Sequence, residues 1–378
     1  MKIGILTLPL HTNYGGILQA WALQTVLERM GHEVKVINKE RIPSAHGLSK
    51  YLRYIKRTIL KYLLRKDITV FYDKKRLADY HTISQNTQTV IDSYIHSLYV
   101  DKLDDLRENT KLFDAIVVGS DQIWRPNYIN WVLRDSVSNA FLAFAQKWNI
   151  KRVSYAASFG TDEWEYNSEQ TKNIIPLIQK FNSVSVREKS GRKLCLSFLG
   201  VKAEHVLDPT MLLDKQDYIS TFGIENEPES EGNLMVYVLD ENESKRNLIK
   251  DIARQRGLKP FTVGAKVDDI SLLPEARIQP KLQTWLRGFY DAEFIVTDSF
   301  HACVFSILFG KPFIAVGNSE RGMSRFESLL GQFGLTNNLV PDNSQYDISR
   351  DYTIPPIAYQ KLEEWRNKSM SFLTNSLS

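Results

Sequence analysis

Short apolar runs alternate with amphipathic stretches along this chain. Residues 2–8 and 34–37 are apolar runs, and residues 17–30 between them place apolar side chains at helical spacing. A strand, a helix and a second strand in this order predict a βαβ unit with a right-handed crossover. The opening of the chain is therefore typical of a parallel, doubly wound α/β sheet.

The same pattern continues to the end of the chain. It predicts strands at 115–118, 152–156, 183–186, 205–207, 234–239, 261–263, 294–297 and 313–316, and helices at 189–198, 244–256 and 358–373. An acidic run with Pro and Gly at 225–232 separates two such series. A chain of 378 residues also exceeds the roughly 250 to 300 at which one core stops growing.

We therefore expect two lobes. The predicted division is a Rossmann-like first lobe at 1–215, a linker at 216–232, a Rossmann-like second lobe at 233–350 and a C-terminal helix at 351–378. Whether this last helix crosses back to the first lobe is left open. We expect the acceptor side of the site in the first lobe and the donor side in the second.

The composition also indicates the cellular compartment of the protein. The chain is 43% hydrophobic and 24% charged, as in folded globular proteins. Its two cysteines, Cys195 and Cys303, form no metal-ligand spacing or disulfide framework, which fits a reducing compartment. No signal peptide or membrane-spanning run is found. We expect a cytoplasmic protein, with a place at the inner face of the membrane left open.

A basic segment at 48–66 stands out against the modest net charge of +4. No Asp or Glu occurs from 41 to 66, and the cations are Lys50, Arg53, Lys56, Arg57, Lys61, Arg65 and Lys66. Apolar residues fall on one helical face: Leu48, Leu52, Ile55, Ile59 and Leu63. The segment is either a helix packed on the first lobe or a helix lying on an anionic membrane surface. We expect no nucleic-acid partner.

Polar loops follow several predicted strands, where ligands bind in open α/β sheets. The loop 11–16 offers Asn13 and Gly15 at a helix start, for an anion or for backbone geometry alone. The loop 119–125 offers Ser120 and Asp121, and capping the next turn accounts for only one of them.

Charged residues end two further strands. Arg187 either pairs with Glu188 or presents its planar fork to a carboxylate or phosphate. His301 begins a helix, where the helix dipole disfavours a cation. It is therefore a candidate for proton transfer, or else a partly buried histidine whose hydrogen bonds are satisfied within the fold. Cys303 is expected to be a packed thiol. In 318–330, Arg321 and Arg325 lie four residues apart, as surface charges or as a second phosphate contact.

Six segments in this order resemble the polysaccharide pyruvyl transferase family. They are Asn13-Tyr14-Gly15-Gly16-Ile17-Leu18-Gln19-Ala20, Val118-Gly119-Ser120-Asp121-Gln122-Ile123-Trp124, Tyr155-Ala156-Ala157-Ser158-Phe159-Gly160, Ser185-Val186-Arg187-Glu188, Asp208-Pro209-Thr210 and Thr297-Asp298-Ser299-Phe300-His301. The resemblance implies a GT-B-like fold of two Rossmann-type lobes with parallel sheets and an interlobe cleft. It also implies transfer of the enolpyruvyl unit of phosphoenolpyruvate, as co-substrate, onto sugar hydroxyls to give a pyruvate ketal in surface polysaccharide biosynthesis. No metal or cofactor is implied.

The resemblance also implies residue roles. His301 matches the family's catalytic His and Arg187 its donor-binding Arg, and from its position we add Asp121 as the base for the attacking hydroxyl. Some members carry Arg in place of Ser299, so Arg325 or Lys311 is expected to substitute, and many carry Gly in place of Ala302. The other candidates are Ser299 and Phe300 for the donor, and Asn13, Tyr14, Gly15, Gly16, Ser120 and Trp124 for the acceptor or its loop.

Two alternatives remain open. A nucleotide-sugar glycosyltransferase would share the two-lobed scaffold and would need an acidic ribose contact, for which Glu320 and Glu327 are candidates. A non-catalytic subunit of a polysaccharide assembly would not need His301 or Arg187. In either enzymatic case the acceptor is a saccharide, free or built on a lipid carrier.

Overall fold

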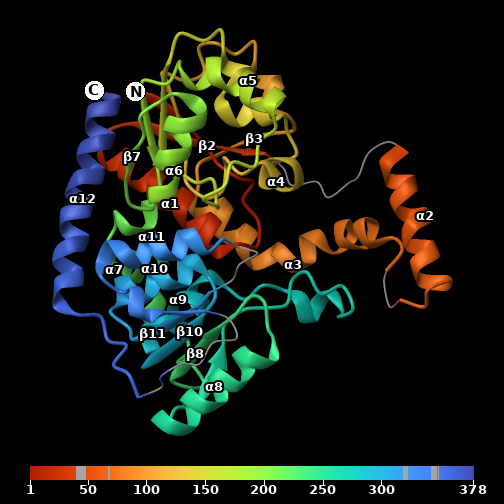
Figure 1. Ribbon diagram of the computed structural model, residues 1–378, viewed down its shortest axis with the longest axis vertical. Coiled ribbons are helices and arrows are strands. Elements are labelled where there is room, and N and C mark those ends of the chain that lie inside the picture. Colours follow the sequence, from red (N-terminus) through yellow and green to blue (C-terminus); the bar gives the residue numbers. More distant parts are fainter. Residues whose placement is uncertain (40–47, 67–68, 318–321, 342–346, 348) are drawn as a thin grey trace.

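The computed structural model describes residues 1–39, 48–66, 69–317, 322–341, 347 and 349–378. The chain folds into two α/β lobes, the first above the second in Figure 1, and each lobe is built on a sheet of parallel strands. The predicted α/β fold of two Rossmann-type lobes is confirmed. Glu320 and Arg321, two of the candidate residues, lie outside the described residues.

The first sheet has the strand order β3-β2-β1-β4-β5-β6-β7. Its strands are β1 (Lys2–Leu6), β2 (Glu33–Lys39), β3 (Ser97–Val100), β4 (Ala115–Val118), β5 (Lys151–Ala157), β6 (Ser183–Val186) and β7 (Glu204–His205). The helices of this part are α1 (Tyr14–Arg29), α2 (Leu48–Tyr62), α3 (Tyr72–Tyr94), α4 (Pro126–Tyr128), α5 (Ser168–Ile178), α6 (Lys189–Leu194) and α7 (Lys215–Phe222). The central strands are apolar and buried on both faces, as parallel strands covered by helices must be.

The second sheet has the strand order β12-β11-β10-β8-β9. Its strands are β8 (Leu234–Tyr237), β9 (Pro260–Thr262), β10 (Phe294–Thr297), β11 (Phe313–Val316) and β12 (Leu339–Val340). Its helices are α8 (Glu243–Arg256), α9 (Leu282–Asp291), α10 (Phe300–Phe309) and α11 (Met323–Phe333). The last helix of the chain is α12 (Pro356–Leu377).

Strand order reverses once in each sheet. In the first sheet the chain runs outward from β1 to β3 and then returns to β4 on the other side of β1. In the second it runs from β8 to β9 and then returns to β10 on the other side of β8. Loops diverge at such a reversal and leave room for a ligand beyond the strand ends. The loops after β4 and β10 both begin there.

One hydrophobic core joins the two lobes. Trp21 of α1 packs against Tyr218 of α7, with ring centroids 5.3 Å apart, and Tyr218 packs against Phe305 of α10 at 4.9 Å. Buried apolar residues of α1, α7, α9 and α10 belong to this one cluster. The expected linker at 216–232 is therefore wrong at its start, because 216–222 form most of α7 and fill this core.

The C-terminal helix lies on the first lobe. Ser369 Oγ accepts a hydrogen bond from Leu207 N at 3.0 Å, and Arg366 donates to the carbonyls of Met211 and Leu213, both at 2.7 Å. Figure 1 shows α12 running along one edge of the molecule beside both lobes. The chain thus returns to its first lobe after completing the second.

The basic helix α2 does not pack its apolar face on the first lobe. Leu52, Ile55 and Ile59 are 62%, 56% and 46% exposed. The interpretation of this segment as a helix packed on the first lobe is therefore wrong for its apolar face. The side chain of Lys50 is outside the described residues. No helix in the described part of the chain is long and apolar enough to span a bilayer.

Candidate active site

A buried cluster of charged side chains lies where loops of the two lobes meet. The first lobe supplies Ser120 and Asp121 after β4, Arg187 and Glu188 after β6, and Asp208 after β7. The second lobe supplies Phe300 and His301 at the start of α10 and Arg325 on α11. All eight side chains are buried. Their chemistry therefore depends on how they pair with one another.

His301 is held between the two lobes. A Cβ added at Gly15, in the first turn of α1, would come within 2.1 Å of His301 Nδ1, so only glycine allows the imidazole this position. His301 Nε2 lies 3.6 Å from Asp208 Oδ2, which is too long for a hydrogen bond but within reach of an ion pair once the ring is protonated. No described group accepts or donates a hydrogen bond at Nε2.

Asp208 is the hub of the cluster. Its Oδ2 accepts hydrogen bonds from Arg187 Nη1 at 2.6 Å and from Ser120 Oγ at 3.0 Å, and its Oδ1 accepts from Thr210 Oγ1 at 2.7 Å. Burial alone would raise the pKa of Asp208, but the protonated His301, Arg187 and Thr210 together hold that pKa far below its ordinary value. Asp208 is therefore an ionised carboxylate beside His301.

Arg187 lies in the middle of three carboxylates. Besides Asp208, its guanidinium lies 3.9 Å from Asp121 Oδ1 and 3.7 Å from Glu188 Oε1. Burial lowers the pKa of Arg187, but these carboxylates outweigh it and the net shift is upward. Nε and Nη2 have no hydrogen-bond partner among the described residues. Unpaired buried donors are rare in proteins and call for an explanation, such as a ligand.

Two cations lie close to the ring of Phe300. The guanidinium of Arg187 lies 4.2 Å from the centre of the ring and that of Arg325 lies 5.8 Å from it. Burial, and then the charge of Arg187, lowers the pKa of Arg325 to about 10, which leaves it charged near neutral pH. The ring thus contacts two cations in a site shielded from water.

Glu188 is the third carboxylate near Arg187. Its Oε1 accepts a short hydrogen bond from Ser158 Oγ, and its Oε2 has no partner in the described part of the chain. Burial raises the pKa of Glu188, although Arg187 and Ser158 oppose the shift.

Asp121 adopts a backbone conformation that is uncommon for a residue with a side chain. Its φ is 64°, in the left-handed region, and its Oδ1 accepts a hydrogen bond from Gln122 N at 2.9 Å. Local strain of this kind concentrates at functional sites. The turn holds Ser120 against Asp208 and Asp121 against Arg187.

Comparison with known proteins places this cluster in a family. A sequence model of the family described as polysaccharide pyruvyl transferase matches residues 13–320, which include seven of the eight clustered residues. The chain belongs to the polysaccharide pyruvyl transferase family. A search of curated protein sequences finds no match.

Several solved structures align with this chain along nearly its whole length, at low sequence identity and with TM-scores under 0.5. UDP-GlcNAc 2-epimerase from Neisseria meningitidis bound to UDP-GlcNAc is 12% identical, with a TM-score of 0.48, over 100% of this chain and 99% of that one. ADP-heptose LPS heptosyltransferase II from E. coli is 12% identical, with a TM-score of 0.38, over 99% and 100%. UDP-N-acetylglucosamine 2-epimerase from Rickettsia bellii is 10% identical, with a TM-score of 0.44, over 99% and 96%.

Three of the residues that the family resemblance suggested for the site lie elsewhere. Lys311 follows the C-terminal end of α10, about 15 Å along the helix from His301, and its Nζ donates to Tyr290 O at 2.8 Å. Trp124 is fully buried in the first lobe, stacks on Phe141 and donates from Nε1 to Ala140 O. Tyr14 is fully buried and donates from its hydroxyl to Pro280 O at 2.6 Å, which links the two lobes. These contacts place the three side chains outside the charged cluster, and their roles in the donor or acceptor site stay predictions.

Three more of the pyruvyl transferase candidates, together with Ala302, flank the cluster. Ser299 caps α10 by accepting from Ala302 N at 3.5 Å. Asn13 is exposed and precedes α1, and Gly16 O accepts from Gln19 Nε2 at 2.9 Å. Ala302 is buried within α10. These residues shape the two helix starts that face each other at Gly15 and His301.

The sequence reasoning missed two members of the cluster as site residues, Asp208 and Glu188, and also Ser158, which donates to Glu188. The motif Asp208-Pro209-Thr210 directly after a predicted strand was the available signal for the first of them. Asp298, by contrast, lies in the His301 loop but accepts from Leu239 N at 2.7 Å and from Lys245 Nζ at 2.9 Å. It ties the loop to β8. Cys303 is a buried thiol whose pKa is raised by burial, as expected of a packed residue.

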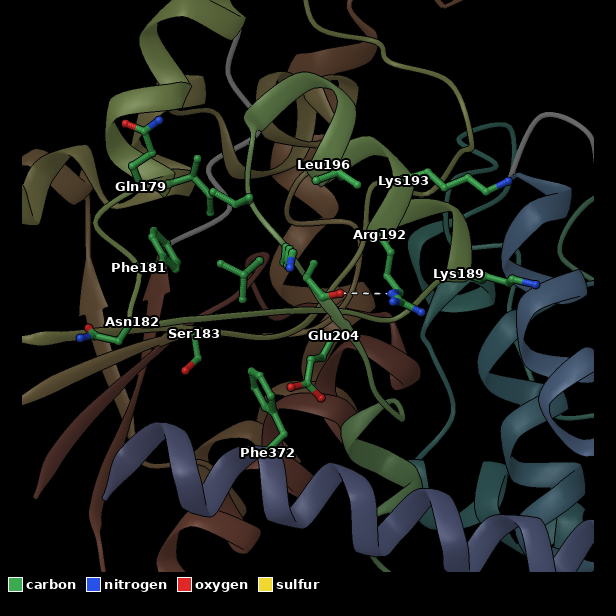
Figure 2. Close-up of a pocket in the computed structure, with 15 residues that line it drawn as sticks. Gln179, Phe181, Asn182, Ser183, Lys189, Arg192, Lys193, Leu196, Glu204 and Phe372 are labelled. Carbon is green, nitrogen blue, oxygen red and sulfur yellow. Dashed lines mark hydrogen bonds between the residues drawn. The ribbon is translucent and has the colours of Figure 1, made fainter.

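One open cavity lies away from this cluster. A space of about 730 Å³ opens beside α6 and the edge strand β7, between Gln179, Arg192 and Phe372 (Figure 2). Arg192 crosses it to donate to Ala203 O at 3.2 Å. None of the charged cluster residues lines it. In the described part of the chain, no group of three His, Cys, Asp or Glu side chains is arranged to hold a metal ion.

Proposed function

We propose that this member of the polysaccharide pyruvyl transferase family moves the pyruvyl unit of phosphoenolpyruvate onto two hydroxyls of one saccharide, forming a pyruvate ketal and releasing phosphate. One observation carries the proposal: Arg187 is buried at the junction of the lobes with two guanidinium nitrogens that no described group satisfies. A planar guanidinium binds carboxylate and phosphate oxygens in pairs, and phosphoenolpyruvate carries both groups.

A second cation supports a donor with two anionic groups. Arg325 lies on the same Phe300 ring as Arg187, so one guanidinium can receive the carboxylate and the other the phosphate. Arg187 belongs to the first lobe and Arg325 to the second. The proposed donor site therefore uses both lobes.

His301 is placed to move the proton that starts the reaction. The methylene carbon of phosphoenolpyruvate takes a proton from the imidazolium and becomes a methyl group, and its neighbouring carbon becomes electrophilic. Nε2 is the nitrogen for this step, because no described group hydrogen-bonds to it. Asp208, 3.6 Å away, balances the charge of the imidazolium before the proton leaves.

Two hydroxyl attacks complete the ketal. The first saccharide hydroxyl attacks the electrophilic carbon and gives its proton to Asp121, the base that its position suggests. The second hydroxyl then attacks the same carbon. As this new C–O bond forms, the bond between that carbon and the phosphate oxygen breaks. The phosphate leaves with the proton of the second hydroxyl. The sum is phosphoenolpyruvate plus a diol giving a ketal plus inorganic phosphate. We propose a saccharide built on a lipid carrier, in surface polysaccharide biosynthesis, as the acceptor.

Thermal unfolding with candidate donors tests the proposal. A ligand that binds only the folded state raises the melting temperature. We expect phosphoenolpyruvate to raise it more than equal inorganic phosphate, and UDP-glucose and UDP-N-acetylglucosamine to leave it unchanged. Stabilisation by a UDP-sugar alone would contradict the proposal and favour a glycosyltransferase. Of the two acidic residues considered for a ribose contact, Glu327 is exposed on α11 and Glu320 is outside the described residues.

A further inference from the structure

Helix α2 presents an apolar face to solvent. Its exposed large side chains are Tyr51, Leu52, Ile55, Ile59 and Tyr62, which are between 46% and 71% exposed. At 3.6 residues per turn these five positions fall within an arc of about 100°. An exposed apolar face of this size on one helix marks a surface for another molecule or for a membrane.

The opposite face attaches α2 to the rest of the molecule. Arg53 lies 5.9 Å from the ring centre of Trp131, Arg57 lies 5.2 Å from that of Tyr72, and the rings of Tyr54 and Phe71 are 5.1 Å apart. These three residues of α2 are half-buried. The apolar face therefore points away from the body, and Figure 1 shows α2 beyond the end of α3, at the edge opposite α12.

Positive charge surrounds this apolar face. Lys56 and Lys61 are exposed and lie on either side of the apolar arc, and Arg65 and Lys66 follow the helix. No acidic residue occurs from 41 to 66 to balance them. A second copy of the chain packed on the same face would bring these cations together, whereas a layer of anionic headgroups would neutralise them.

We propose that α2 lies flat on an anionic lipid surface, with its apolar side chains at the level of the headgroups and Lys56, Lys61 and Lys66 near lipid phosphates. A helix of 15 residues is only about 22 Å long, shorter than the hydrocarbon core of a bilayer, so it lies in the plane of the surface.

Helix α3 connects this surface to the junction of the lobes. It begins at Tyr72 beside α2, and further along it Tyr80 stacks on His11 at 4.2 Å and Asp79 accepts from Arg277 Nη1 at 2.5 Å. His11 belongs to the loop before α1, and Arg277 belongs to the second lobe. A surface-bound α2 thus holds the junction near the lipid. The proposal does not depend on the proposed function, because vesicle binding needs neither His301 nor Arg187.

Co-sedimentation with vesicles tests the proposal. We expect the full chain to bind vesicles of phosphatidylcholine mixed with phosphatidylglycerol and not phosphatidylcholine alone, with less binding at high salt. The triple variant Lys56→Glu, Lys61→Glu and Lys66→Glu should bind at least about tenfold more weakly. The double variant Ile55→Ser and Ile59→Ser should also bind more weakly, because it removes the inserted apolar side chains.

A matched control separates the helix from net charge. The triple variant Lys147→Glu, Arg246→Glu and Lys250→Glu makes the same charge change at exposed sites elsewhere, and we expect wild-type binding from it. All variants replace exposed residues, and thermal unfolding without lipid checks that they fold. Equal loss in the control triple, or no binding by the unchanged chain, overturns the proposal. A lipid-free dimer that Ile55→Ser and Ile59→Ser abolish, without vesicle binding, would assign the face to a second copy and also overturn it.

Discussion

Gly15 lies directly against His301, so that a Cβ added to the glycine would stand 2.1 Å from the imidazole Nδ1. The two residues come from different lobes and each lies in the first turn of its helix, α1 or α10. The position of the proposed proton donor therefore depends on how the lobes meet. Gly16, the next residue, offers a comparison, because its Cβ would meet only Asn13 side-chain atoms, at 3.4 Å or more.

Gly15→Ala should displace the imidazole of His301 and lower the rate of phosphate release from phosphoenolpyruvate by about 100-fold, since a misplacement of about 1 Å can have this effect. Gly16→Ala should keep the rate and raise the free energy of unfolding by about 0.5–1 kcal/mol, because alanine favours a helix over glycine. Initial rates and urea unfolding of both variants check this. Equal rates in the two variants would show that the His301 position is unimportant.

Asp208→Asn should lower the free energy of unfolding by about 3–5 kcal/mol, because it leaves Arg187 buried without its closest counter-charge. The same change at Asp104, in an exposed pair with Arg107, should cost about 1 kcal/mol or less. The pKa of Asp208 is lowered in the folded state from its ordinary 3.8. The stability that ionised Asp208 contributes is therefore fully present above pH 3.8 and is lost as the pH falls below this value. Urea unfolding of the three proteins measures both effects.

His205 should make folding depend on pH below neutrality. Burial lowers its pKa from 6.5 to about 4, and its Nε2 donates to Arg187 O at 2.9 Å. The unfolded chain binds more protons between these two values, so the free energy of unfolding should fall by up to about 3 kcal/mol as the pH drops from 6.5 to 4. His205→Gln should flatten this slope in urea unfolding across that range. An unchanged slope would mean that another group causes it.

Arg325 and Lys311 should differ in their effect on donor binding. Arg325→Ala removes a cation from the Phe300 ring and should weaken phosphoenolpyruvate binding by about 10- to 100-fold, the effect of losing a charge-assisted hydrogen bond. Lys311→Ala changes a residue beyond the far end of α10 and should leave binding within about twofold. Calorimetric titration of both variants decides. A larger loss at Lys311 would support its predicted role.

The sequence predicted the strands of the two sheets except β3 and β12, because buried parallel strands are short apolar runs. Ala115–Val118 and Phe294–Thr297 appear in the structure with the predicted bounds. It did not predict α3, since Tyr72–Tyr94 carries polar residues around most of its circumference and has no periodic apolar stripe. The sequence likewise did not predict α7, because its composition resembles that of a linker. Its few apolar side chains are buried only because they pack in the core that both lobes share.

The sequence predicted which loops form the site but not which side chains pair with one another within it. Arg187, Asp121 and His301 follow predicted strands, and the structure brings them into one cluster. Asp208 was missed as a site residue, because its role arises from Arg187, Ser120 and His301, which are distant in sequence. Lys311 was a candidate for the donor because Ser299 stands where some family members carry Arg. The ten residues of α10 carry it away from His301.

Calorimetric titration with phosphoenolpyruvate tests the central claim, that the buried guanidinium of Arg187 binds the donor and His301 acts on it. The unchanged chain should bind, and His301→Gln should bind within about threefold, because the proton transfer follows binding. Arg187→Lys keeps the charge but loses the planar fork and should bind at least about tenfold more weakly. No binding by the unchanged chain, or equal affinity in Arg187→Lys, would contradict the account.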